Sequence, residues 1–128
     1  MVNQGDIIKL NFNPQSGHEQ AGYRPAVVVS NDFFNAKTNL AIVCPITNTS
    51  RAFPLHVPLD DRTVTTGVVL CEHVKALDLS TRSFKFIEQL PDDLLDRVIS
   101  IVFAGIKKQN QEICQDELGE ADNEENEF

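Results

Sequence analysis

The stretch LPDDLLDRVISIVFAGI, residues 90–106, is the most strongly helical segment of the chain. Pro91 suits a first helical turn, and Asp92 and Asp93 favour the positive, N-terminal end of a helix dipole. Gly105 lies near the other end, where helices commonly stop. The apolar residues fall on one stripe, which comprises Leu94, Leu95, Val98, Ile99, Val102 and Ile106. This pattern predicts an amphipathic helix that packs with one face against the rest of the protein.

The residues before this helix have the patterns of short strands. Three segments alternate apolar and polar residues, as half-buried strands do: GDIIKLNFN (5–13), FPLHVPL (53–59) and SFKFIEQL (83–90). Two continuous apolar runs are typical of strands covered on both faces: PAVVVS (25–30) and LAIVCPI (40–46). GVVLCEHVKALDL (67–79) is interpreted as one strand that bends into another. Pro54 and Pro58 indicate an edge position for the strand that contains them.

Several short strands followed by one amphipathic helix indicate a small, strongly bent antiparallel sheet or barrel with the helix packed against it. A chain of 128 residues is long enough for one domain with a modest core. Asn31 or Asp32 is expected to cap a brief helical turn through Phe34 and Ala36. We therefore expect a mainly β fold with one C-terminal helix.

The net charge of −8 is distributed unevenly along the chain. All 11 Lys and Arg residues lie at or before Lys108, whereas 8 of the 19 acidic residues follow it. The segment up to residue 108 is therefore neutral, and its charge neither excludes nor requires a nucleic-acid ligand. We expect a folded domain over residues 1–108 and an acidic, disordered tail over 109–128.

Composition and targeting signals favour a cytoplasmic protein. No apolar run approaches the roughly 20 residues that a membrane helix needs, and MVNQGDIIKLNF lacks the pattern of a secretory signal. The three cysteines, Cys44, Cys71 and Cys114, have no CxxC spacing and suit reduced thiols better than disulfides.

The motifs of common catalytic and cofactor sites are missing from the sequence. His18, His56 and His73 lie on three different segments without the spacing of metal ligands, so they are interpreted as unrelated polar side chains. Phosphate-loop, dinucleotide and serine-hydrolase motifs are also absent. We therefore predict neither a metal nor a cofactor.

Two polar loops next to buried strands are candidate sites. In QSGHEQAGYRPAVVVS (15–30), Arg24 precedes Pro25, which favours an extended backbone at Arg24. Its guanidinium can then bind a phosphate, although, for this loop taken alone, a surface ion pair with Glu19 is the favoured interpretation. PITNTSR (45–51) offers hydroxyl and amide groups to a ligand, but these are also ordinary turn residues.

Taken together, these elements resemble one family. The order is GDI, GHEQAGYRPAVVVS (17–30), VCPIT (43–47), FPLHVPL, GVVL and the final LPDDLLDRV helix, and the likeness extends over about 100 residues. In these elements the chain is similar to the MazF/PemK family of toxin endoribonucleases from type II toxin–antitoxin systems. The most specific elements are G-x-E-Q-x-G-x-R-P and PIT.

The resemblance implies an SH3-like barrel of the MazF/CcdB type, which forms a homodimer and cleaves single-stranded RNA without a metal or other cofactor. It also implies a cognate antitoxin whose acidic C-terminal segment blocks the RNA groove, and DNA binding together with that antitoxin. The acidic tail of this chain is expected to be solvated, although it could also lie across that groove.

Residue roles carry over from the family position by position. Arg24 and Thr47 correspond to its catalytic pair, and Glu19 to its loop glutamate, which is assigned acid–base or orienting work. His18 is the second choice as the base. The residues expected to bind substrate are His18, Gln20, Tyr23, Asn48, Thr49, Ser50, Arg51 and Phe53. For Phe53, burial in the core is an equally good reading.

Departures from the family pattern leave alternatives open. Glu72 and His73 stand where relatives show an Asp-Gln-Val element, which leaves base preference undetermined. A gyrase poison of the CcdB type has the same fold, but its terminal Trp-Gly-Ile is replaced here by FAGI (103–106). An inactive binding module of the same fold is the third alternative.

Overall fold

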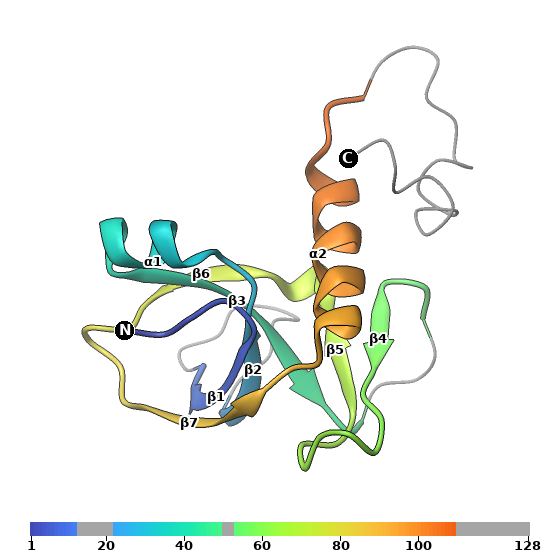
Figure 1. The fold of residues 1–128 in the computed structure, drawn as a ribbon, viewed down its shortest axis with the longest axis horizontal. Helices are drawn as coiled ribbons and strands as arrows, with labels where there is room; N and C mark the ends of the chain where they lie inside the picture. The colour runs from blue at the N-terminus through green and yellow to red at the C-terminus, as the bar shows by residue number, and fades with distance from the viewer. Residues whose placement is uncertain (13–21, 50–52, 110–128) are drawn as a thin grey trace.

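The fold was analysed in a computed structural model that describes residues 1–12, 22–49 and 53–109 (Figure 1). Two strands come first: β1 (Asp6–Asn11) and β2 (Tyr23–Val28). The short helix α1 (Asp32–Thr38) follows, and then β3 (Leu40–Thr47), β4 (His56–Pro58) and β5 (Val68–Leu70). A single 3₁₀ turn, η1 (Cys71–His73), separates β5 from β6 (Lys75–Asp78), and β7 (Phe84–Gln89) and the helix α2 (Asp92–Ile106) end the described chain.

All pairs of strands are antiparallel, and the order across the sheet is β4-β5-β3-β2-β1-β7. β3 is a central strand that pairs with β2 along one side and with two strands, β6 and β5, along the other. Its first half pairs with β6, from Leu40 to Val43, and its last two residues, Ile46 and Thr47, pair with β5. The 67–79 segment therefore bends at η1, as its sequence predicts. β4 lies at the edge of the sheet, as Pro58 predicts. The strand expected over 53–59 is shorter than predicted, because Pro54 and Leu55 form a turn before it.

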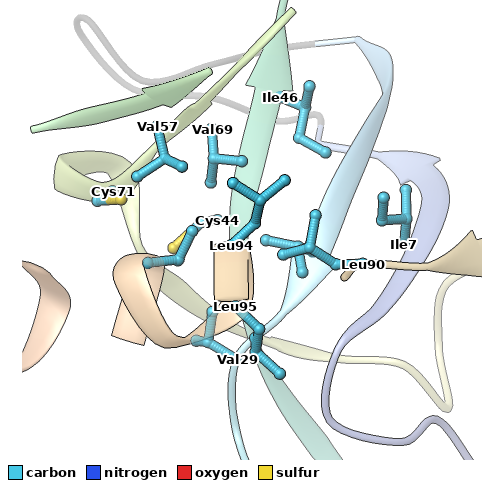
Figure 2. Close-up of a cluster of buried hydrophobic side chains, with 12 residues drawn as sticks. Ile7, Val29, Cys44, Ile46, Val57, Val69, Cys71, Leu90, Leu94 and Leu95 are labelled. Atoms are coloured by element: carbon cyan, nitrogen blue, oxygen red, sulfur yellow. The ribbon is translucent and has the colours of Figure 1, made fainter. Parts of the chain in front are cut away.

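The sheet buries apolar side chains on both faces. Along β2, Val27 belongs to the cluster beneath α2, whereas Ala26 and Val28 belong to a second cluster with β1 and β6. Figure 2 shows the first cluster, in which side chains from β3, β4 and β5 gather around Leu94 and Leu95 of α2. Strands with two buried faces explain why residues 25–30 and 40–46 are continuously apolar.

Two thiols lie inside the first cluster. Cys44 of β3 and Cys71 of η1 are both buried and reduced. A hydrogen bond of the Cys44 thiol with Cys71, together with burial, raises the pKa of Cys44. Both side chains therefore act as small apolar groups of the core, in keeping with the reduced state expected for these two cysteines. Cys114 lies outside the described residues.

The helices begin at or within one residue of the predicted positions. The Asn31 side chain accepts a hydrogen bond from the Phe34 N–H at 2.8 Å, which caps the N-terminus of α1. α1 ends at Thr38, and the capping residue Asn39 has a φ of 60°, in the left-handed region. α2 begins at Asp92, with Pro91 in the capping position. In the described residues no helix is long and apolar enough to cross a membrane.

Two expectations about burial are wrong. The apolar stripe of α2 does not stay buried to its end, because Ile106 is 72% exposed at a point where the helix extends past the sheet. Within the described ranges β7 pairs with β1 alone, at the edge of the sheet, and its Phe84 and Phe86 are 38% and 54% exposed. Sequence periodicity predicts a face for each residue, but it does not show where the covering element ends.

Candidate functional site

Arg24 lies at the beginning of β2, where the strand leaves the 13–21 segment. Its backbone is paired with Leu10 of β1, and the neighbouring Tyr23 is paired with Asn11. The extended conformation predicted before Pro25 is therefore present. The Arg24 side chain is half-buried, whereas Tyr23 is 56% exposed. Strand pairing thus holds the base of the arginine side chain in a rigid part of the sheet.

Thr47 is the last residue of β3 and is only 4% exposed. Its hydroxyl oxygen Oγ1 accepts a hydrogen bond from the Thr49 N–H at 3.2 Å and lies 3.0 Å from Oγ1 of Thr49. Asn48 and Thr49 are exposed beyond the end of the strand. Backbone and side-chain bonds together fix the position of the Thr47 hydroxyl next to two exposed polar residues.

The pairing between β2 and β3 relates Arg24 to Thr47. The observed partners are Ala26 with Pro45, Val27 with Cys44 and Val28 with Val43. Continuing this antiparallel register by two residues sets Arg24 opposite Thr47. Directly opposite residues in such a pair point to the same face of the sheet. The sheet therefore brings the two predicted catalytic residues to the same end of neighbouring strands.

Phe53 lies at the surface and not in the core. It is 49% exposed, and its ring contacts the ring of His56 with centroids 5.0 Å apart and planes tilted by 57°. The His56 N–H also donates to the Phe53 carbonyl at 2.9 Å. Of the two interpretations of Phe53 from sequence, the structure excludes burial and leaves an aromatic face that a nucleobase can contact.

The interpretation of the histidines as unrelated is wrong for two of them. Nε2 of His56 lies 2.7 Å from Oε2 of Glu72, and Nε2 of His73 lies 3.8 Å from the same oxygen. Nδ1 of His73 is buried and has no hydrogen-bond partner within the described part of the chain. These residues come from β4 and η1, so their distance in sequence hides the cluster. The described residues contain no group of three or more His, Cys, Asp or Glu side chains that could hold a metal ion.

A surface hollow of about 540 Å³ lies beside Tyr23 and was not predicted from sequence. Asn11, Tyr23 and the 81–83 turn before β7 line it. Nη1 of Arg82 donates to the Asn11 carbonyl at 2.9 Å, and Nζ of Lys9 lies 5.2 Å from the centre of the Tyr23 ring. Arg82 and Lys9 thus supply positive charge next to an exposed aromatic ring, at the same end of β1 and β2 as Arg24.

The remaining predicted site residues lie outside the described residues. They are His18, Glu19 and Gln20 in the 13–21 segment, and Ser50 and Arg51 in the 50–52 segment. Both segments adjoin the site: the first leads into Gly22 and β2, and the second follows Asn48 and Thr49. The described part of the site therefore consists of Arg24 and Thr47 with their neighbours on β1, β2 and β3.

Comparisons with known sequences and structures identify relatives of this chain. The family described as "PemK-like, MazF-like toxin of type II toxin-antitoxin system" matches residues 3–103. Endoribonuclease PemK of Escherichia coli is 34% identical over 102 residues, which are 77% of each chain. Endoribonuclease toxin ChpB of Escherichia coli K12 is 38% identical over 101 residues, covering 75% of this chain and 86% of ChpB.

Solved structures agree with the sequence relatives. MazF from Deinococcus radiodurans is 34% identical, has a TM-score of 0.78, and the match covers 84% of this chain and 97% of that one. A MazE–MazF complex from the same organism has a TM-score of 0.73 at 34% identity, with the same coverage. These structures confirm the expected mainly β, MazF-type fold with a C-terminal helix.

The family match spans the described sheet and nearly all of α2, and it includes both candidate residues at the ends of β2 and β3. The chain therefore belongs to the PemK-like, MazF-like family of toxins of type II toxin–antitoxin systems.

Proposed function

We propose that the protein is an endoribonuclease that cleaves single-stranded messenger RNA at selected sequences without a metal ion. The observation that carries this proposal is the β2–β3 register, which extends to set Arg24 opposite Thr47. The names of the relatives support the same activity, because PemK, MazF, ChpB and EndoA are all described as endoribonucleases.

The proposed reaction is an attack within the RNA backbone. The 2′-OH loses its proton and its oxygen bonds to the adjacent phosphorus, while the bond from phosphorus to the 5′-oxygen of the next nucleotide breaks. The leaving oxygen takes up a proton. The products are a 2′,3′-cyclic phosphate and a 5′-OH end, and no water or metal enters this step.

Arg24 and Thr47 would stabilise the charge that develops on the phosphorane. A guanidinium can donate two parallel hydrogen bonds to the non-bridging oxygens, and arginine stays protonated in proteins, so Arg24 acts through electrostatics. Thr47 Oγ1 already accepts a hydrogen bond from the Thr49 N–H. Its own hydroxyl hydrogen can therefore turn from the Thr49 hydroxyl towards a phosphate oxygen at little cost.

The proton transfers are assigned to the 13–21 segment. Glu19 is the proposed base for the 2′-OH, and His18 is the second candidate. This assignment rests on the family resemblance, because both residues lie outside the described structure. It requires the segment before Gly22 to reach the phosphate held by Arg24.

Substrate contacts are proposed on both sides of the catalytic pair. Asn48 and Thr49 are exposed directly after Thr47, and Phe53 presents half of its surface for stacking on a base. Tyr23 offers a second exposed ring. We assign the remaining contacts to Gln20, Ser50 and Arg51, which precede or follow these positions in sequence.

The proposed partners are an antitoxin and a second copy of the chain. Solved complexes of MazE with MazF from Deinococcus radiodurans support an antitoxin, whose acidic C-terminal segment we expect to occupy the RNA groove. The exposed Phe103 and Ile106 on α2 leave apolar surface for a homodimer. A messenger RNA substrate implies action in the cytoplasm, and DNA binding is proposed only for the toxin–antitoxin complex.

The decisive experiment is cleavage of a long mixed-sequence RNA in the presence of EDTA. The intact protein is compared with Arg24→Ala and with Arg97→Ala, a control that removes an exposed arginine of α2. Defined bands from the wild type and Arg97→Ala, with 5′-OH ends, and their loss in Arg24→Ala are expected.

If the intact protein does not cleave RNA, two explanations remain, and one more variant distinguishes them. A chain that ends at Lys108 lacks the acidic tail, and activity that appears only in this chain would make the tail an inhibitor. Continued absence of cleavage would overturn the nuclease proposal in favour of an inactive binding module or a gyrase-binding protein.

A further inference from the structure

Gly67 is packed against the backbone of Thr47 more tightly than any side chain permits. A Cβ atom at Gly67 would lie 2.3 Å from the Thr47 carbonyl oxygen, 2.8 Å from the Thr47 carbonyl carbon and 3.1 Å from Oδ1 of Asn48. Cβ atoms essentially never approach another heavy atom to less than 3.0 Å. The φ of Gly67, +114°, is in addition a conformation that L side chains rarely adopt.

The environment holds Gly67 in this place from two sides. The next residue, Val68, is the strand partner of Thr47, and the Gly67 carbonyl accepts a hydrogen bond from the Leu59 N–H at 2.9 Å. Gly67 therefore cannot retreat from Thr47 without breaking the pairing of β5 with β3 or of β4 with β5.

The turn before Gly67 is itself anchored by a carboxylate. Glu88 of β7 accepts hydrogen bonds from the Val64 N–H at 3.1 Å, from the Thr65 N–H at 2.8 Å and from the Thr65 hydroxyl at 2.8 Å. Charged acceptors make stronger hydrogen bonds than neutral ones. A chain of contacts thus runs from Glu88 through the 64–66 turn to Gly67 and on to the Thr47 carbonyl.

The other described glycines with positive φ lack such a contact. Gly5 has a φ of +92°, but a Cβ there would meet only the ends of the Gln89 and Leu95 side chains, at 3.1 and 3.2 Å. A Cβ at Gly22 would meet nothing within 4 Å. Gly5 therefore has the same backbone requirement as Gly67 without the contact to Thr47.

We propose that Gly67, held by the Glu88-anchored turn, is a positioning residue that sets the Thr47 hydroxyl for catalysis. A side chain at position 67 pushes the Thr47 carbonyl and the 47–49 turn away from β5, and the Thr47 hydroxyl moves with them. A displacement of about 1 Å in an active site can cost about 100-fold in rate. This inference rests on the role of Thr47 in the proposed function.

The test is a double-mutant cycle between Gly67 and Thr47. Single-turnover cleavage of an RNA oligonucleotide with a mapped site is measured for the wild type, Gly67→Ala, Thr47→Ala and the double variant, with RNA affinity measured alongside. Gly5→Ala is the control for strain at positive φ. Incubations long enough to quantify residual cleavage are used for the slow variants.

A positioning role predicts a specific pattern. In the wild-type protein, Gly67→Ala lowers the cleavage rate at least about tenfold. In Thr47→Ala, the same substitution lowers the rate about twofold or less, and in both proteins RNA affinity stays nearly unchanged. An equal loss in both backgrounds, or a rate like that of Gly5→Ala, would overturn the proposal. If Gly67→Ala does not fold, Glu88→Gln takes its place in the same cycle, with a smaller loss that again depends on Thr47.

Failure of the proposed function is distinguishable from failure of this inference. If the wild type cleaves no RNA, the amide of Thr49, which donates to the Thr47 hydroxyl, is followed by NMR. A changed Thr49 amide shift and faster exchange in Gly67→Ala, but not in Gly5→Ala, support the positioning contact without any activity. An unchanged Thr49 amide in Gly67→Ala would refute it.

Discussion

Removal of the Thr47 hydroxyl is the sharpest test of the proposed chemistry, because the structure separates its effect on activity from its effect on stability. Thr47→Val retains the branched shape of a side chain that is only 4% exposed. What disappears is one hydroxyl, which accepts from the Thr49 N–H at 3.2 Å and can donate to the substrate phosphate.

The expected loss of activity is large and the expected loss of stability is small. Removing one preorganised donor to a developing oxyanion typically costs about 100- to 1000-fold in kcat. The lost internal hydrogen bond costs about 0.5–1.5 kcal/mol, and water can replace it because Thr49 is exposed. For a domain of this size, about 1 kcal/mol corresponds to a fall of about 4–8 °C in Tm.

The assay combines single-turnover RNA cleavage with thermal unfolding. Thr38→Val is a matched control, because Thr38 Oγ1 likewise accepts from the N–H two residues ahead, that of Leu40, at 3.0 Å. The control is expected to lose similar stability and no activity. Thr47→Val that is folded, binds RNA and cleaves within about threefold of the wild type would refute the role assigned to Thr47.

Two further predictions concern stability. Partial burial of Glu88 acts against its ionisation, but the hydrogen bonds from Thr65 and Val64 outweigh it and lower its pKa from the ordinary 4.5. Ionised Glu88 therefore stabilises the fold above pH 4.5, and this stabilisation is lost as the pH falls through the folded pKa of Glu88. The Tm of Glu88→Gln should therefore depend less on pH than the Tm of the wild type between about pH 7 and pH 3. An equally steep pH dependence of Tm in the variant would contradict this prediction. Val98 of α2 is completely buried in the cluster between the helix and the sheet, so Val98→Ala should cost about 2–3 kcal/mol in urea unfolding with an unchanged m-value. Val64→Ala, at a side chain that is 80% exposed, should change stability by less than about 0.5 kcal/mol, and equal losses in both variants would argue against the core described here.

Much of the fold follows from local patterns in the sequence. Alternation over residues 5–13, continuous apolar runs over 25–30 and 40–46, and the stripe of the final helix each depend on neighbours a few residues away. The edge position of β4 follows from Pro58, since proline cannot donate to a strand ladder. Arg24 and Thr47 were predicted because they lie in the two most specific motifs of the family.

The constellations that sequence reasoning missed all join distant segments. Glu72 pairs with His56 across 16 positions, and Arg82 reaches the Asn11 carbonyl across 71. No sequence motif has these spacings, because the residues of each pair come together only through the order of the strands. The sequence also left the burial of Phe53 undecided, because burial of a ring depends on whether a distant element of the chain packs over it.

By itself, the sequence determined the strands, the closing helix and the two catalytic candidates, because periodicity and motif are local properties of the chain. Only the tertiary structure decided that β2 and β3 are neighbours in a register that sets Arg24 opposite Thr47 when it is extended, and that Gly67 lies against the Thr47 carbonyl. Strand order and register come from burying both faces of the sheet at once, and this requirement involves residues far apart in the chain. The sequence therefore identifies the candidate residues, and the fold determines how they are arranged in space.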